Sequence, residues 1–482
     1  MKKLKKILIW FVVILGILII GLYVTASVTV SHFKPRLENI LTDELGYQTR
    51  INGSLALKLL PGVSFVINDL RIINNETYLV RIEKAEIAVD YRQLFNSDID
   101  ITGLSLVKPQ VFIEHNTDGS FNYDIPEHAK NPHPAKKGQS HQIDIRHISI
   151  KNGRLIYFDN ELGDTLIAKG IDVVSDEINF SGILDRMNMK KLRFTGSIHL
   201  GSLRINEMRL DSIQWKIEAR SGKISVQSRS PRFFEGKYNG VTTIDFNTKP
   251  ALVNIQSHIT GLDIGEFREA AHLTGLFYGS LNYDMNLTFR SFNWKQAMST
   301  LDGDLIITGQ KMLLQGISLN SIILNYKDSK AFDVAGFAAL FITGPFGTVF
   351  TKDIRFGYQP ENNSGVSEDI SRIVSNWTIH NGVARARDVA LVTDRYRLTM
   401  TGQINLIGGN YNDVKIALIN KFGCPVISLQ MNGPFLSPEK ESSSSISPSN
   451  ISMVEFWKDL ANSTRKYCKP VYSGSLKPPV AH

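Results

Sequence analysis

The first pattern along the chain is a continuous run of apolar residues. Residues 7–26 carry no charge and follow four lysines within residues 2–6. At a rise of about 1.5 Å per residue this run makes a helix of about 30 Å, long enough to cross a hydrocarbon core. Lysines favour the cytoplasmic side, so the pattern predicts that the rest of the chain lies across the membrane. A cleaved signal peptide is the alternative, but its apolar region needs only about 7–15 residues, and the cleavage site near Ser27 is poor.

After a predicted amphipathic helix over residues 31–45, the hydrophobic period changes from helical to alternating. Two alternating segments flank Pro61-Gly62. This arrangement predicts a β-hairpin, because alternate side chains of a strand share one face and Pro-Gly favours a turn. The side chains that point to one face of the two predicted strands are Leu55, Leu57, Leu59, Val63, Phe65 and Ile67.

Short alternating segments continue to about residue 436, interrupted by helical patterns only near residues 265–272 and 292–301. The chain is therefore predicted to be mainly β. At one strand and turn per 10–12 residues, we expect about thirty strands. Examples are strands at residues 99–101, 104–106 and 111–113, with a slip in the alternation at Gly103 that is typical of a bulge, and a turn at residues 151–153. The C-terminal tail is expected to be either irregular or a final edge strand.

Composition divides the chain into regions. Residues 331–351 are apolar but interrupted by glycine and proline, which indicates a buried or groove-lining segment rather than a second transmembrane helix. Ser452 and Glu455 form a capping box that begins a predicted helix. The predicted regions are the cytoplasmic lysines and membrane anchor (1–27), an N-terminal β region (28–125), a Pro- and His-containing linker (126–141), an elongated β region (142–436), a Ser-rich linker (437–450), and a C-terminal helix and tail (451–482).

Charge and cysteine content exclude several function classes. The net charge is +8, but four of the positive charges are the N-terminal lysines. The sequence has no dense run of basic residues with interleaved aromatics, which is the pattern that would indicate nucleic-acid binding. The two cysteines, Cys424 and Cys468, are too few for a disulfide framework and lack metal-site spacing. On sequence alone, a disulfide between them and two free thiols are equally compatible.

No motif indicates catalysis. The sequence lacks a nucleophile elbow, a phosphate-binding P-loop and a His-Glu-x-x-His helix. Three histidines lie in residues 126–141, but prolines and lysines crowd them and their spacing fits no metal site, so a solvated loop is the better interpretation. We therefore expect no enzyme activity, no metal and no cofactor.

Several loose patches, in a specific order, resemble the AsmA family of envelope proteins of Gram-negative bacteria. They begin with the single anchor helix. The other patches are residues 51–70, 101–111, 116–123, 148–159, 301–304, 314–319, 381–391, 400–406 and 426–438. The resemblance implies an inner-membrane protein facing the periplasm, with a chorein-like β region at its start and an elongated, curved, antiparallel β-sheet groove. It also implies a part in outer-membrane biogenesis, with phospholipid as cargo.

The sequence is compatible with two function classes. In the first, the alternating strands form an apolar groove that carries phospholipid, and the six hairpin residues Leu55 to Ile67 line it. In the second, the same side chains form a packed core, and the protein acts without lipid cargo as an assembly or interaction factor that affects the insertion of outer-membrane proteins through other envelope proteins. Alternation alone is compatible with both, because it fixes one apolar face but not what covers that face.

Overall fold

The computed structural model describes the chain as two compact units, residues 1–224 and residues 225–482. The division falls inside the predicted region 142–436. The described residues are 34–58, 62–74, 77–89, 101–124, 147–161, 163–179, 192–206, 208–270, 277–315, 367–435, 437–444 and 469–478.

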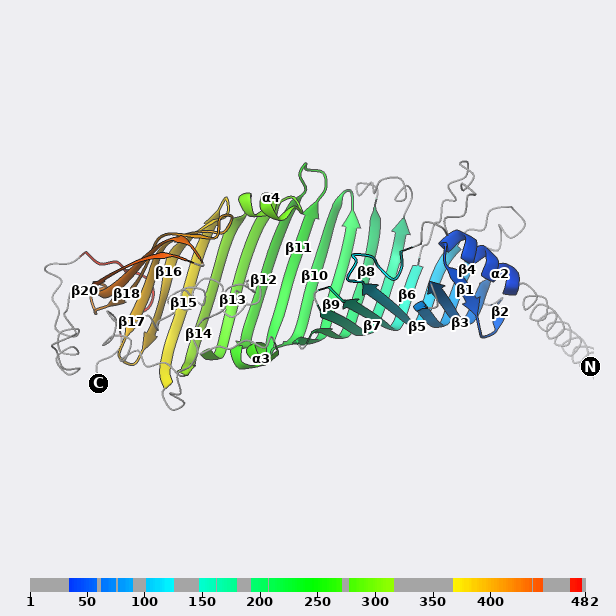
Figure 1. Cartoon of the computed structure of the whole chain (residues 1–482), viewed down its shortest axis with the longest axis horizontal. Coiled ribbons are helices and arrows are strands. Elements are labelled where there is room, and N and C mark those ends of the chain that lie inside the picture. Colours follow the sequence, from blue (N-terminus) through cyan, green and yellow to red (C-terminus); the bar gives the residue numbers. More distant parts are fainter. Residues whose placement is uncertain are drawn as a thin grey trace, which may run out of the picture. The chain divides into compact units, whose positions relative to one another are not determined.

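The first unit is a sheet with one helix beside its first strands (Figure 1). Strands β1 and β2 both pair with β3, and β3 to β9 then pair in sequence order. The elements are α2 (Lys34–Leu45), β1 (Gln48–Ile51), β2 (Leu55–Lys58), β3 (Ser64–Asn74), β4 (Thr77–Val89), β5 (Ile101–His115), β6 (His147–Asp159), β7 (Asp164–Asn179), β8 (Arg193–Ile205) and β9 (Met208–Arg220).

One pair in this sheet departs from the predicted antiparallel arrangement. Strand β6 runs parallel to β5, with Leu104 beside Ile148 and Val111 beside Leu155. A parallel pair needs a crossover of a dozen or more residues, and residues 116–146 separate the two strands. The predicted linker at residues 126–141, which lies outside the described residues, falls within this crossover.

The second unit holds the remaining strands and two short helices. Strands β11 to β20 pair in sequence order, each antiparallel to the next. The elements are β10 (Lys223–Phe233), β11 (Gly236–Asp245), β12 (Leu252–Asp263), α3 (Ile264–Ala270), β13 (Phe277–Arg290), α4 (Trp294–Ser299), β14 (Asp302–Gln315), β15 (Ser367–His380), β16 (Val383–Thr393), β17 (Arg397–Asn405), β18 (Asn410–Ile419), β19 (Pro425–Pro434) and β20 (Glu439–Ser444).

The described strands are longer than predicted: the described residues form twenty strands, many of 10 to 16 residues. The segments expected as three strands between residues 99 and 113 form one strand, β5, in which Lys108 has a positive φ of 48°. Similarly, the turn expected at residues 151–153 is an irregularity inside β6. A slip in alternation marks either a turn or a bulge, and only the pairing with neighbouring strands distinguishes them.

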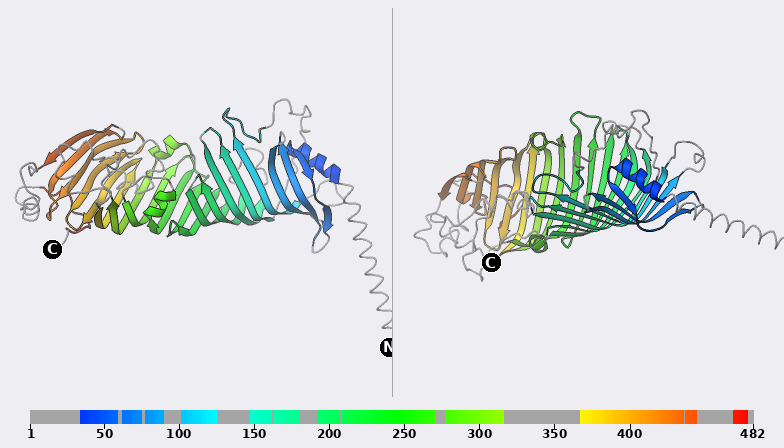
Figure 2. Two further views of the ribbon diagram at one scale, coloured as in Figure 1. Left: turned by 60° about the horizontal axis from the view of Figure 1, so that its bottom comes forward. Right: turned by 45° about the vertical axis from the view of Figure 1, so that its right-hand side comes forward.

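Other predicted elements are confirmed. The hairpin around Pro61-Gly62 is β2 paired with β3. The helices predicted at residues 31–45, 265–272 and 292–301 correspond to α2, α3 and α4. The elements lie side by side in one layer within each unit (Figure 2). Among the described elements, extensive contacts occur only between paired strands or between a short helix and an adjacent strand.

The membrane segment cannot be compared with the structure. Within the described part of the chain, no helix is long and apolar enough to cross a membrane. The predicted anchor over residues 7–26, the apolar residues 331–351 and the capping box at Ser452 all lie outside the described residues.

Candidate functional site

The pairing register aligns apolar side chains across the first unit. Leu106 lies beside Ile150, and Ile150 lies beside Val173. Val173 in turn lies beside Ile198, which lies beside Trp215. Because paired residues of neighbouring strands point to the same side of a sheet, these five side chains form a row across β5 to β9. We call this row the first apolar face.

All five side chains of the first apolar face are half-buried. On the opposite side of the same strands, Ser197 and Lys216 are exposed and polar. No second sheet or helix among the described elements packs over β5 to β9. A single layer with one apolar side therefore leaves apolar surface within reach of a ligand, and an acyl chain gains about 0.8 kcal/mol for each CH₂ that it buries.

The predicted hairpin residues lie at the N-terminal end of the first unit. Two of their side chains are more deeply covered there than those of the first apolar face. Leu55 is paired with Ile67, and Leu57 with Phe65, so the four share one face. Leu55 and Ile67 are 6 % and 0 % exposed. Their core cluster is packed against Leu37 and Leu41 of α2, with Leu57 at its margin. Helix α2 thus closes this end of the sheet face. Phe65 and Val63 are half-buried, and Leu59 lies outside the described residues.

Sequence reasoning therefore placed the candidate groove at the hairpin and did not single out the first apolar face. The signal was present in the sequence, because Ile150, Val173, Ile198 and Trp215 all sit at apolar positions of alternating segments. What sequence reasoning lacked was the position of α2, which decides where the apolar side of the sheet is covered.

A corresponding row in the second unit is buried. Ile259, Tyr283, Ile307, Ser375 and Val389 lie beside one another in β12 to β16. All five are less than a tenth exposed, and burial raises the pKa of the Tyr283 hydroxyl. The neighbouring Trp377 is 1 % exposed, and its indole N–H donates to Ser375 Oγ at 2.7 Å. In the second unit this row is packed rather than open.

The C-terminal tail covers the other side of the sheet in the second unit. Residues 469–478, which we call the strap, pack Tyr472 and Leu476 onto Ala390, Ala417 and other apolar residues of β16 and β18. These residues alternate along the strands with residues on the side of the buried row that contains Val389. Both sides of β16 to β18 are therefore buried. Of the two expectations for this tail, the irregular segment is confirmed for the strap and the edge strand is not, because side chains hold the strap against the sheet face.

Polar groups fix the strap in place. The Arg397 guanidinium donates to the Leu476 carbonyl at 3.0 Å and to the Asn420 carbonyl at 2.7 Å, and burial lowers the Arg397 pKa. The Asp388 carboxylate accepts from the Tyr472 hydroxyl at 2.6 Å and from the Ser475 N–H at 2.9 Å.

Cys424 is buried and disulfide-bonded. The chain has only one other cysteine, Cys468, which lies outside the described residues. The Gly423 carbonyl, next to Cys424, accepts from the Val471 N–H at 2.9 Å, so the strap begins beside this disulfide.

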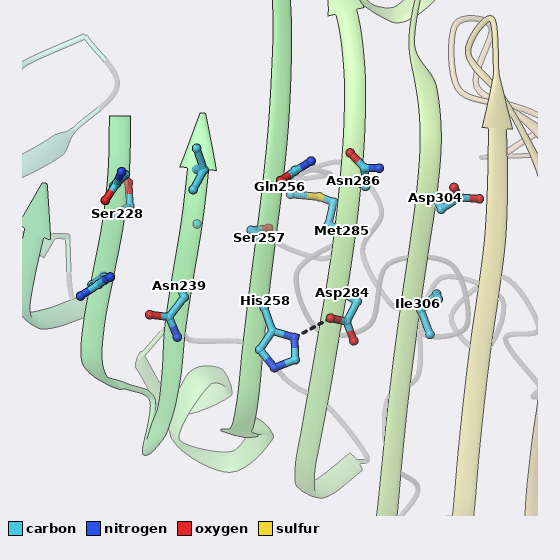
Figure 3. Close-up of a pocket in the computed structure, with 14 residues that line it drawn as sticks. Ser228, Asn239, Gln256, Ser257, His258, Asp284, Met285, Asn286, Asp304 and Ile306 are labelled. Atoms are coloured by element: carbon cyan, nitrogen blue, oxygen red, sulfur yellow. Dashed lines mark hydrogen bonds and ion pairs between the residues drawn. The ribbon is translucent and has the colours of Figure 1, made fainter. Parts of the chain in front are cut away.

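A separate hollow of about 630 Å³ lies over strands β10 to β14 (Figure 3). Most of its lining residues belong to the polar side of the sheet. His258 contacts Asp284 through Nδ1, and His258 Nε2 lies 2.8 Å from Thr260 Oγ1. Both ring nitrogens are therefore engaged, which leaves His258 no free nitrogen for proton transfer or metal binding.

Candidate metal ligands do not cluster in the part of the chain that the structure describes. No group of three or more His, Cys, Asp or Glu side chains there has an arrangement that could hold a metal ion. The histidines of residues 126–141 lie outside the described residues. Among the sites described, the first apolar face is the one that offers a row of half-buried apolar side chains to an apolar ligand.

Comparison with known protein families identifies a match over most of the chain. The model of the AsmA family matches residues 1–199 and again residues 187–389. No curated protein and no solved structure matches the chain.

Proposed function

The chain belongs to the AsmA family, and from this membership and the first apolar face we propose that it carries phospholipid. Acyl chains lie along the half-buried row from Leu106 to Trp215, and headgroups stay in water. The single observation that carries the proposal is this row, five apolar side chains on one side of a single layer with no described element packed over them. Lipid binding of this kind needs apolar area rather than a motif.

The proposal includes a place for the protein in the cell. The lysines and apolar run at residues 2–26 support an anchor in the inner membrane, with both units in the periplasm. A disulfide at Cys424 suits an oxidising compartment such as the periplasm. In this location the protein acts in outer-membrane biogenesis, without catalysis or cofactor.

Site-specific photo-crosslinking in living cells tests the lipid cargo. A photoreactive amino acid replaces Ile198 or Trp215 in the full chain, and mass spectrometry identifies what becomes attached. We expect phospholipid adducts at both positions. Ser197 and Lys216 are matched control positions, because they lie on the same strands but on the exposed polar side.

The same experiment separates the alternative function. An assembly or interaction factor without cargo would give protein adducts, or none, at Ile198 and Trp215. Equal lipid labelling at Ser197 and Lys216 would also contradict the proposal, since it would show nonspecific contact with membrane lipid.

A further inference from the structure

Phe292 is the most exposed large apolar side chain in the described part of the chain, at 64 %. It lies in the turn between β13 and α4, and Figure 1 shows α4 at one end of the strands of the second unit. Its ring is 6.0 Å from that of Phe246, which follows β11. The two loops are joined by a hydrogen bond from the Ser291 N–H to the Ala251 carbonyl at 3.0 Å. Two aromatic rings from different turns thus form one cluster at this rim.

Hydrogen bonds on both sides of Phe292 fix the backbone of its loop. Ser291 has a positive φ of 81°, a region that costs energy for a residue with a side chain. The backbone N–H of Arg290 donates to Thr300 Oγ1 at 2.9 Å, and Asn293 caps α4 through the Gln296 N–H. The exposure of Phe292 is therefore built into the loop, although burying an aromatic ring would be favourable in water.

Cationic side chains surround the aromatic pair in the sequence. Lys249 follows Phe246 by three residues, and Arg290 and Lys295 flank Phe292. All three cations are exposed, and no ion pair within the described residues involves them. We call the set of Phe246, Lys249, Arg290, Phe292 and Lys295 the rim patch.

We propose that the rim patch binds the surface of an anionic phospholipid bilayer. Aromatic rings and basic side chains together are the combination that suits a membrane interface, because rings enter the headgroup boundary while cations meet phosphate. Charge complementarity selects an anionic bilayer over a neutral one. This inference deepens the proposed function and rests on it, since a phospholipid carrier has to meet the membrane that supplies or receives its cargo.

Vesicle tethering by the full chain tests the proposal. The chain is reconstituted in phosphatidylcholine vesicles, and a second population containing phosphatidylglycerol is added. We expect light scattering to report tethering that falls with added salt. The triple variant Lys249→Glu, Phe292→Ser, Lys295→Glu should lose about tenfold or more in tethering, since each basic residue contributes measurably to binding an anionic surface.

A second aromatic and cation pair provides the matched control. Lys421 Nζ lies 5.2 Å from the ring of Phe422, which is 38 % exposed and lies outside the rim patch. The variant Lys421→Glu, Phe422→Ser should tether like the unmodified chain. Circular dichroism verifies folding of both variants, and salt sensitivity of the unmodified chain provides a measurement that needs no variant.

Three results would overturn the inference: no tethering of anionic vesicles by the unmodified chain, equal tethering of phosphatidylcholine vesicles, or tethering unaffected by the triple variant and by salt. Tethering requires no cargo. If it fails while Ile198 and Trp215 still crosslink to lipid, the rim patch is excluded and lipid carriage stands. If crosslinking fails while tethering persists, the proposed function fails instead.

Discussion

Two isoleucines on the apolar side of the first unit have opposite surroundings. Ile67 is completely buried beneath α2, whereas Ile198 is half-buried in the first apolar face. The same residue type is thus core in one place and accessible surface in the other. This contrast provides a direct test of where the sheet is packed and where it is open.

We expect Ile67→Ala to lower the free energy of unfolding by about 2–5 kcal/mol, because it leaves a cavity in a closed core. Ile198→Ala should lower it by only about 1 kcal/mol, since that side chain is only partly buried in the folded protein. Chemical denaturation followed by circular dichroism measures both. Equal losses would show that Ile198 is core and would weaken the case for an open face.

Glu86 links the first strands electrostatically. Its carboxylate accepts from Lys58 Nζ at 3.0 Å and from Ser64 Oγ at 2.9 Å. The hydrogen bond from Lys58 is the largest cause that lowers the Glu86 pKa below its ordinary value of 4.5, and burial opposes it. A carboxyl group with a lowered folded pKa stabilises the fold above the unfolded pKa, and this contribution is lost as pH falls through the folded value.

Glu86→Gln should therefore reduce stability at neutral pH, and the difference from the unmodified chain should shrink below about pH 4.5. Thermal unfolding across a pH series measures this. Glu83→Gln is the control, because Glu83 is an exposed acid on the same strand that pairs with Lys108. A difference that does not change with pH would show that the Glu86 contacts do not contribute in this way.

At the scale of elements, the strap changes the environment of three strands. Ala390, Val392, Ala417 and Ile419 are all buried, and they occupy the side of the sheet opposite the inward-facing row. The sequence of a strand that is buried on both faces is a continuous run of apolar residues, not an alternation of apolar and polar residues. Residues 389–392 and 416–419 have this pattern, which is the sequence signal that something covers both sides.

Deleting residues 469–482 should lower the unfolding temperature and expose the apolar residues beneath the strap, so that a hydrophobic dye binds. The deletion also leaves the buried Arg397 without its partner carbonyl at Leu476, which adds to the cost. Deleting only residues 479–482 is the matched control, because it keeps the strap. Unchanged stability and no dye binding in the longer deletion would contradict a structural role for the strap.

At the scale of the whole molecule, the arrangement of strands in single layers determines which apolar surface is exposed. A layer with an apolar side exposes that side unless another element covers it. In this protein the covering elements differ along the chain: α2 covers the first strands, and β5 to β9 have no described cover. The proposed lipid carriage along the first unit therefore requires an uninterrupted first apolar face.

We expect Ile198→Asp to block lipid transfer, because a charge in the middle of the row would have to be desolvated beside an acyl chain. Ser197→Asp introduces the same charge on the exposed polar side and should leave transfer unchanged. Transfer of labelled phospholipid between donor and acceptor vesicles, with the full chain present, compares the two. Equal activity would mean that lipid does not pass over Ile198.

The sequence by itself determined the mainly β class, the first hairpin and the three helices that were found, because hydrophobic period and turn residues act over a few neighbouring positions. It did not determine strand length or direction: the segments between residues 101 and 113 form one strand with a register shift next to Gly103, and β6 runs parallel to β5. Alternation also fixed which side of each strand is apolar. Only the tertiary structure decided which strands are covered by α2 or by the strap and which have no described element over them, since burial depends on residues distant in the chain.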